Sequence, residues 1–123
     1  MITGLVDARL EARITLFVED ASGQTQSIEA VVDTGFSGFL CLPPTLIASC
    51  GLPWLCEEQA MLADGSIQVL DVYSVTIIWD SQSRTVRVSA VDTAPLVGMK
   101  LLQGSEVLIR VVAGGLVRID ALP

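Results

Sequence analysis

The chain has 123 residues, of which 51% are hydrophobic, and this size allows one domain with its own core. It carries 14 acidic and 7 basic side chains, for a formal net charge of −7, and it contains no histidine. An acidic chain without a basic run argues against nucleic-acid or membrane partners. The lack of histidine excludes Ser-His-Asp and Cys-His catalysis and most zinc sites. We therefore expect a single domain over residues 1–123 without a metal site.

Apolar runs in the sequence are too short for a membrane span, which needs about 20 apolar residues in a row. Residues 39–48 are interrupted by Pro43 and Pro44, and residues 107–117 contain Arg110. The beginning of the sequence shows no basic region followed by an apolar stretch. We therefore expect no signal peptide and a cytoplasmic location.

Three cysteines, Cys41, Cys50 and Cys56, have spacings that fit no zinc or redox motif. The simplest interpretation is three small, buried, reduced side chains in a reducing compartment. A reactive thiol is the alternative interpretation, although no neighbouring side chain offers a base.

Alternation of apolar and polar side chains with period two dominates the chain and predicts short strands. In chain order the strands are expected at residues 13–19, 27–32, 39–42, 57–63, 67–79, 84–91, 107–112 and 116–120. Turn signals separate them, and they lie at residues 21–23, at Asp64-Gly65, at residues 80–83 and at Gly114-Gly115.

Two short helices are also expected. One covers residues 45–50 between Pro44 and Gly51, and the other covers residues 99–103 before Gly104. No alternation of strands and helices recurs along the chain. We therefore predict an all-β fold of short antiparallel strands with one or two short helices.

The segment Val31-Val32-Asp33-Thr34-Gly35 places a carboxylate at the end of an apolar strand. Such a carboxylate is costly to desolvate unless hydrogen bonds hold it, and the backbone amides that follow it can supply them. An ordinary strand-end turn accounts for this tripeptide equally well. A second segment, Leu96-Val97-Gly98, lies about 65 residues later and leads into the second helix.

With these two motifs in this order and a glycine-tipped hairpin between them, the chain resembles the retropepsin-like aspartic proteases over residues 14–103. Residues 32–40 and 62–66 look like the small single-domain bacterial type. The resemblance implies an acid-protease barrel of short antiparallel strands. It also implies an aspartic endopeptidase that hydrolyses an extended peptide or protein substrate without a metal or organic cofactor.

The chain contains a single Asp-Thr-Gly, so the resemblance implies a homodimer with Asp33 of each subunit on the two-fold axis. One ionised Asp33 would activate the water, and the other, protonated, would hydrogen-bond the substrate carbonyl. Thr34 would bond across the axis, and Gly35 would hold the carboxylates, which completes the catalytic set. The implied substrate contacts are Phe36, Ser37, Asp64, Gly65, Leu96 and Val97, with Asp64-Gly65 at the tip of a mobile flap.

The sequence departs from the family at three positions. Phe36 stands where retroviral relatives usually have alanine and pepsin-type relatives have a hydroxyl residue. Met99 and Ser37 stand where the viral proteins have a paired arginine and aspartate. These departures keep the catalytic pair and leave the substrate pocket and the dimer strength open.

Two alternative functions remain at this point. The first is a peptide- or protein-binding module on the same fold, catalytically weak or inactive because Phe36 crowds the cleft. The second is a structural all-β domain in which Asp-Thr-Gly occurs by chance. Hydrolysis that depends on Asp33 distinguishes the protease from both alternatives.

Overall fold

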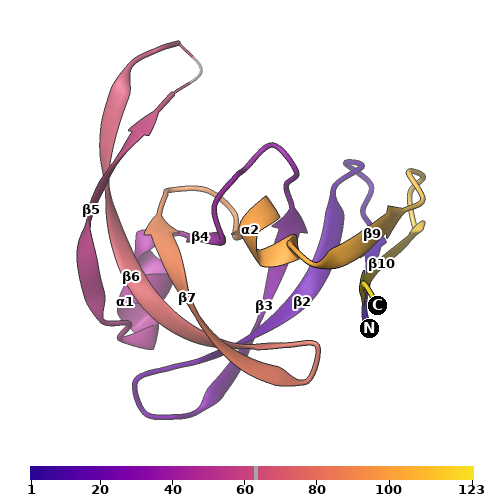
Figure 1. Cartoon of the computed structure of the whole chain (residues 1–123), viewed down its shortest axis with the longest axis horizontal. Coiled ribbons are helices and arrows are strands. Elements are labelled where there is room, and N and C mark those ends of the chain that lie inside the picture. Colours follow the sequence, from indigo (N-terminus) through magenta and orange to yellow (C-terminus); the bar gives the residue numbers. More distant parts are fainter. Residues whose placement is uncertain (63) are drawn as a thin grey trace.

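The computed structural model describes residues 1–62 and 64–123 and consists of one mixed β-sheet with two short helices (Figure 1). The strands are β1 (Ile2–Val6), β2 (Ala12–Glu19), β3 (Thr25–Val32), β4 (Leu40–Leu42), β5 (Trp54–Met61), β6 (Ile67–Trp79), β7 (Gln82–Ala90), β8 (Leu96–Val97), β9 (Ser105–Ile109) and β10 (Leu116–Ala121). The helices are α1 (Pro44–Cys50) and α2 (Met99–Leu102). The prediction of an all-β fold with few short helices is confirmed.

Six strands form a closed ring. The sheet order is β5-β6-β7-β4-β8-β3-β2-β1-β10-β9, and β6 also pairs with β2. This additional pairing closes β6-β7-β4-β8-β3-β2 on itself. The hairpin of β5 and β6 projects from one side of the ring, and β1, β10 and β9 extend the sheet on the other side (Figure 1).

The expectation of purely antiparallel pairing is wrong at two places. Strand β3 pairs in parallel with β8, and β4 pairs in parallel with β7. The first pairing arises because β8 inserts between β3 and β4, although these two follow each other in the sequence. A two-residue strand is too short to show alternation, so the sequence pattern misses β8 and its parallel pairing with β3. The second joins strands that are far apart in the sequence, and local alternation does not show their relative direction.

Other element boundaries differ more modestly from the predictions. Strand β1 was not expected, because the turn signals near it are weak, yet it pairs with both β2 and β10. Strand β5 begins at Trp54 rather than residue 57, and β9 covers Ser105–Ile109 rather than residues 107–112. The predicted end of β5 at Ala63 lies outside the described residues.

The core fills the ring with aliphatic side chains from all six of its strands. Alternation along β2 directs every second side chain inward, and the long β6 contributes Val75 and Ile77 in the same way. The largest fully buried side chains are Ile14, Leu16, Leu40, Leu42, Ile77, Leu101 and Ile119. Burial of this apolar surface, at about 25 cal/mol per Å², provides the main stabilisation of the ring.

Helix α1 has the start and stop signals read from the sequence. Pro44 stands at its first turn, where a missing N–H costs nothing, and Gly51 ends it in the left-handed region at φ 64°. Its buried residues, Ile47 and Cys50, cover the open end of the ring beside β4. Within the described residues, no helix is long and apolar enough to cross a membrane.

Candidate active site

Strand β8 fixes the end of β3, where the Asp33 turn begins. Val31 and Val32 pair with Leu96 and Val97 in the parallel ladder. The Asp33 amide continues this ladder by donating to the Val97 carbonyl at 2.9 Å. Leu96-Val97-Gly98 therefore lies directly behind the turn, and the backbone of Asp33 has little freedom to move.

The Asp33 carboxylate is held by the turn that follows it. Its Oδ1 accepts a hydrogen bond from the Gly35 N–H at 2.9 Å, and the Phe36 N–H donates to the Asp33 carbonyl at 3.2 Å. The Asp33 side chain is half-buried, and none of the ion pairs among the described residues includes it. One carboxylate oxygen is thus oriented by an amide, while Oδ2 has no protein donor and is available to a water or a second carboxyl group.

Phe36 packs inward against two glycines. A Cβ built on Gly98 would stand 2.5 Å from the Phe36 ring, and one built on Gly38 would stand 2.6 Å from it. Only glycine fits at either position, which accounts for the glycine in the Leu96-Val97-Gly98 motif. The ring lies outside the set of residues that line the groove at Asp33. The substrate contact expected of Phe36 stays a prediction, and in the single chain its role is packing.

The loop of residues 33–39 also caps helix α2. The N–H groups of Gly98, Met99 and Lys100 donate to the carbonyls of Phe39, Phe36 and Gly38 at 3.0, 2.8 and 3.1 Å. These N–H groups belong to the first turn of a helix, where no partner exists within the helix itself. The Asp33 loop and α2 therefore form one hydrogen-bonded unit.

Asp33 lines an open groove of about 360 Å³. The other residues of the groove are mainly apolar and come from the β1–β2 loop, the start of β2, β3, β8, β9 and the β9–β10 loop: Leu10, Glu11, Ala12, Val31, Val32, Leu96, Ile109 and Val111. The groove is open to solvent, so a water or an extended substrate can reach the half-buried carboxylate.

A cysteine that the sequence did not single out for this site lies close to Asp33. Cys41 pairs with Leu96, which in turn pairs with Val31, so these three side chains share one face of the sheet. Burial, and after it the negative charge of Asp33, raises the pKa of the Cys41 thiol to about 11. The alternation of Cys41 with the core residues Leu40 and Leu42 was the available signal, because it directs Cys41 to the opposite face.

Thr34 and Ser37 are exposed at the surface of the same loop. Neither hydroxyl takes part in a hydrogen bond among the described residues. The bond expected of Thr34 across a two-fold axis therefore remains a prediction, and its hydroxyl is free to make one.

The structure does not bring Asp64 and Gly65 to Asp33. They lie in a loop of residues 62–66 at the far end of the projecting β5–β6 hairpin, away from the groove (Figure 1). The expected two-residue Asp-Gly turn is wrong, because the strands end at Met61 and Ile67. Instead the Gly65 N–H donates to the Leu62 carbonyl at 2.9 Å, with Gly65 at φ 85°.

Asp64 stabilises this loop through local hydrogen bonds. Its Oδ1 accepts from the Ser66 hydroxyl at 2.6 Å and from the Ser66 N–H at 2.9 Å. These bonds, the hydroxyl bond first, lower the pKa of the Asp64 carboxyl. Because the Asp64 carboxylate already makes these bonds within the turn, it is less suited to bind substrate directly in this conformation.

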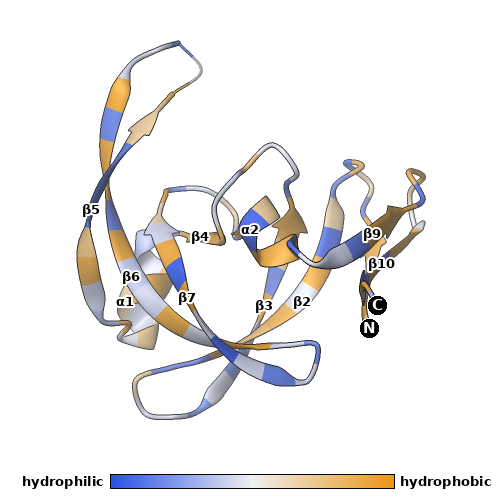
Figure 2. Cartoon of the chain, viewed as in Figure 1, coloured by the Kyte–Doolittle hydropathy of each residue, from blue (hydrophilic) through white to orange (hydrophobic). Residues whose placement is uncertain are grey.

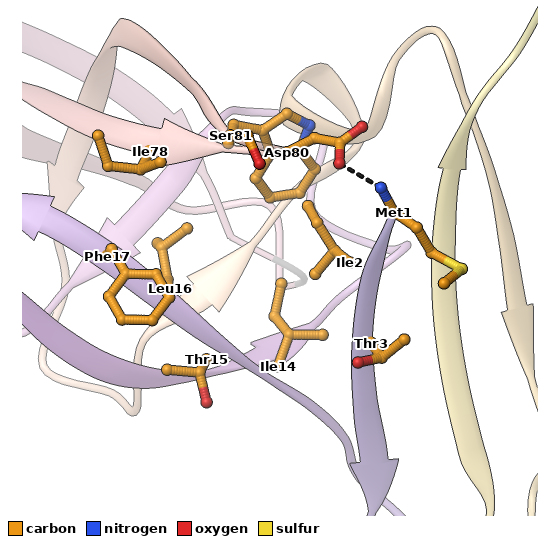
Figure 3. A pocket seen from close by; sticks show the side chains of 11 residues that line it. Met1, Ile2, Thr3, Ile14, Thr15, Leu16, Phe17, Ile78, Asp80 and Ser81 are labelled. Carbon is orange, nitrogen blue, oxygen red and sulfur yellow. Dashed lines mark hydrogen bonds and ion pairs between the residues drawn. The ribbon is translucent and has the colours of Figure 1, made fainter.

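A second cavity, of about 310 Å³, lies where β1 and β6 diverge along β2 (Figure 3). Ile14, Leu16 and Phe17 line it, and the Met1 amine pairs with Asp80 at its edge. It shares no lining residue with the groove at Asp33. Among the described residues, no group of three or more His, Cys, Asp or Glu side chains is placed to hold a metal ion.

No protein-family model matches the chain, and no curated protein or solved structure matches it with statistical significance.

Proposed function

We propose that the chain is an aspartic endopeptidase that acts as a homodimer, in which two Asp33 carboxyl groups share one water and one proton. One observation carries this proposal. The Asp33 carboxylate is fixed by the Gly35 amide, lies in an apolar groove and has no cation paired with it among the described residues. A carboxylate that is oriented by an amide and has no basic partner remains able to share a proton with a second carboxyl group.

The chemistry needs two carboxyl groups in different protonation states. The ionised Asp33 accepts a proton from the water as the water oxygen attacks the carbonyl carbon of the peptide. The protonated Asp33 of the partner subunit donates to the carbonyl oxygen and stabilises the tetrahedral intermediate. Collapse of that intermediate breaks the C–N bond, and the proton passes to the leaving amine. One water is consumed, and no cofactor is required.

The arrangement around Asp33 supports this chemistry through its rigidity. Strand β8 fixes the backbone before the turn, and the three hydrogen bonds to α2 fix the backbone after it. A carboxylate held in this way needs little reorganisation when the reaction begins, and such preorganisation is a major source of catalytic power.

The binding-module alternative required Phe36 to crowd the cleft. In the single chain the ring rests on Gly38 and Gly98 and is not among the residues that line the groove at Asp33, and this position favours the protease over that alternative. We also place the proposed activity in the cytoplasm. All three cysteines are free in the structure, as a reducing compartment favours.

The decisive experiment compares the parent protein with Asp33→Asn on denatured protein substrates between about pH 3 and pH 8. We expect Asp33→Asn to lose hydrolysis with an unchanged melting temperature, because the two side chains have nearly the same shape. Glu106→Gln, which neutralises an exposed carboxylate on β9, serves as the matched control and should cleave like the parent. Full hydrolysis by Asp33→Asn would contradict the proposal.

A further inference from the structure

The chain exposes more surface than a compact monomer of its mass. Its accessible surface is 7129 Å², whereas a folded monomer of 13.1 kDa exposes about 6400 Å². The excess of about 700 Å² is close to the area of about 800 Å² that each partner buries in a standard protein–protein interface.

The exposed large hydrophobic side chains are concentrated in two regions of the molecule. One set lies on the β5–β6 hairpin and its tip: Trp54, Leu55, Met61, Leu62, Ile67 and Val69. The other set includes two residues that line the groove containing Asp33, Leu10 and Val111, and Val112 beside Val111 in the β9–β10 loop. The tips of the β1–β2 and β9–β10 loops, the Asp33 loop and the hairpin all project on one side of the ring (Figure 1). Apolar segments are visible on the hairpin and at the β9–β10 loop (Figure 2).

Leu10 is held in a strained conformation that keeps its side chain exposed. Its φ is 62°, a region that bulky side chains rarely adopt, and the side chain is 58% exposed. Asp7 maintains the turn, because its carboxylate accepts from the Arg9 and Glu11 amides at 2.9 and 3.0 Å and pairs with Arg13 at 2.6 Å. An exposed leucine kept under strain is unexplained by the stability of the single chain, and strain of this kind marks functional positions.

The loop of residues 110–115 presents Val111 and Val112 in a similarly rigid manner. The Gly114 N–H donates to the Val6 carbonyl at 2.8 Å, and the Val6 N–H donates to the Gly115 carbonyl at 2.9 Å. Val111 and Val112 are nevertheless 64% and 63% exposed. Apolar groups that are already ordered lose little conformational entropy when a partner covers them, so this loop is suited to binding.

From these observations we propose that a second copy of the chain docks on the surface formed by the β1–β2 and β9–β10 loops, with Leu10 and Val111 as its apolar anchors. This inference rests on the proposed protease, in which a second Asp33 must approach the first. Leu10 and Val111 line the same groove as Asp33, so a partner that brings its own Asp33 into contact must also cover them.

The terminal strands do not offer an alternative route to the dimer. Strand β1 is paired on both edges, by β2 and β10, and β10 is paired on both edges, by β1 and β9. A partner strand could therefore join them only by displacing a strand of the same chain. The loops beside Asp33 require no such rearrangement.

The test measures dimerisation by sedimentation over a concentration series for the parent, Leu10→Asn, Val111→Glu and Leu122→Glu. Leu122 is exposed beyond the opposite end of β10 and serves as the matched control. We expect each of the two groove variants to weaken the dimer at least about tenfold, and specific activity to fall in parallel on dilution. Leu10→Asn should also melt at the same or a higher temperature, because asparagine tolerates positive φ better than leucine does.

The outcomes separate the docking surface from the proposed chemistry. Groove variants that dimerise like the parent while hydrolysis still depends on Asp33 would overturn the docking surface and leave the protease in place. A monomeric parent would overturn the docking surface and, with it, the homodimeric protease. Variants that sediment normally but show a higher KM would assign the surface to the substrate and overturn docking as well. Hydrolysis that survives Asp33→Asn would remove the protease, and the sedimentation data would still decide the surface.

Discussion

The Phe36 ring occupies the space where a side chain at Gly98 would stand, so the loop that carries Asp33 packs directly on the start of helix α2. The first motif of the sequence is thereby packed directly on the second, although they are about 65 residues apart. This contact makes the two motifs one structural unit, and it can be tested from either side.

Gly98→Ala should disrupt the Asp33 loop. The new Cβ would stand 2.2 Å from the Gly38 carbonyl oxygen as well as 2.5 Å from the Phe36 ring, so backbone must shift. We expect a loss of about 2–3 kcal/mol in the free energy of unfolding and a large loss of hydrolysis. Gly23→Ala is the control, because Gly23 has open space around it and costs only about 1 kcal/mol for its positive φ. Equal melting temperatures for the two variants would show that the contact between Phe36 and Gly98 can accommodate a methyl group.

Phe36→Ala tests the same contact from the opposite side. Because the half-buried ring packs on Gly38 and Gly98, its removal should destabilise the fold by about 2–3 kcal/mol, less than a fully buried phenylalanine. Phe17→Ala, at a side chain that is 43% exposed, should cost less. A cleavage profile on a peptide library accompanies the melting curves. A changed profile with unchanged stability would instead show that Phe36 lines the substrate pocket.

The β5–β6 and β2–β3 hairpin turns share the same type of glycine hydrogen bond, so the β2–β3 turn serves as the control in a test of the flap. Gly65 donates to the Leu62 carbonyl at φ 85°, and Gly23 donates to the Asp20 carbonyl at φ 83°. Proline at either position loses the N–H and cannot adopt the positive φ, so both turns should be damaged alike. We expect Gly65→Pro to reduce turnover and Gly23→Pro to leave it unchanged, with small effects on melting for both. Equal turnover in the two variants would argue that the β5–β6 hairpin is not a flap.

Cys41 predicts a loss of stability at alkaline pH. Its pKa is raised in the folded chain from 9.0 to about 11, by burial first and by Asp33 second, so the folded state holds the thiol proton more tightly than the unfolded state. The corresponding stabilisation is complete below pH 9 and disappears as the pH rises through 11, with an upper bound of about 3 kcal/mol.

Thermal unfolding of the parent and Cys41→Ala across this pH range measures the effect. The alanine variant should lack the decline that the thiol causes. Thiol titration of the folded parent at pH 8 should label the half-buried Cys56 and spare the buried Cys41. Rapid labelling of Cys41 would show that its surroundings are more open than the structure indicates.

Alternation along the strands was sufficient to predict the all-β class and most strands, because strands such as β2 bury every second side chain in the core. It could not predict β8, whose two residues, Leu96 and Val97, reach their partners only after the chain has passed through β4 to β7. Such contacts form only in the tertiary structure and cannot be predicted from the local sequence.

For the candidate site, too, the local features were predictable from the sequence and the long-range contacts were not. The turn from Asp33 to Gly35 was predictable, since the acid, the apolar strand and the glycine are adjacent in sequence. The inward packing of Phe36 and the position of Cys41 beside Asp33 depend on Gly98 and Leu96, which are distant in sequence. The flap tip was misjudged because Asp64-Gly65 fits both a two-residue turn and the longer loop that occurs.

The insertion of β8 between β3 and β4 also determines when the site can form during synthesis. A growing chain that ends before Leu96 leaves the facing edges of β3 and β4 open, and the Asp33 loop then lacks the amides of residues 98–100 that hold it. The ribosome must release almost four-fifths of the chain before the carboxylate reaches its final setting. Shorter nascent chains therefore carry the Asp-Thr-Gly sequence without the strand pairing and hydrogen bonds that hold its loop in the folded chain.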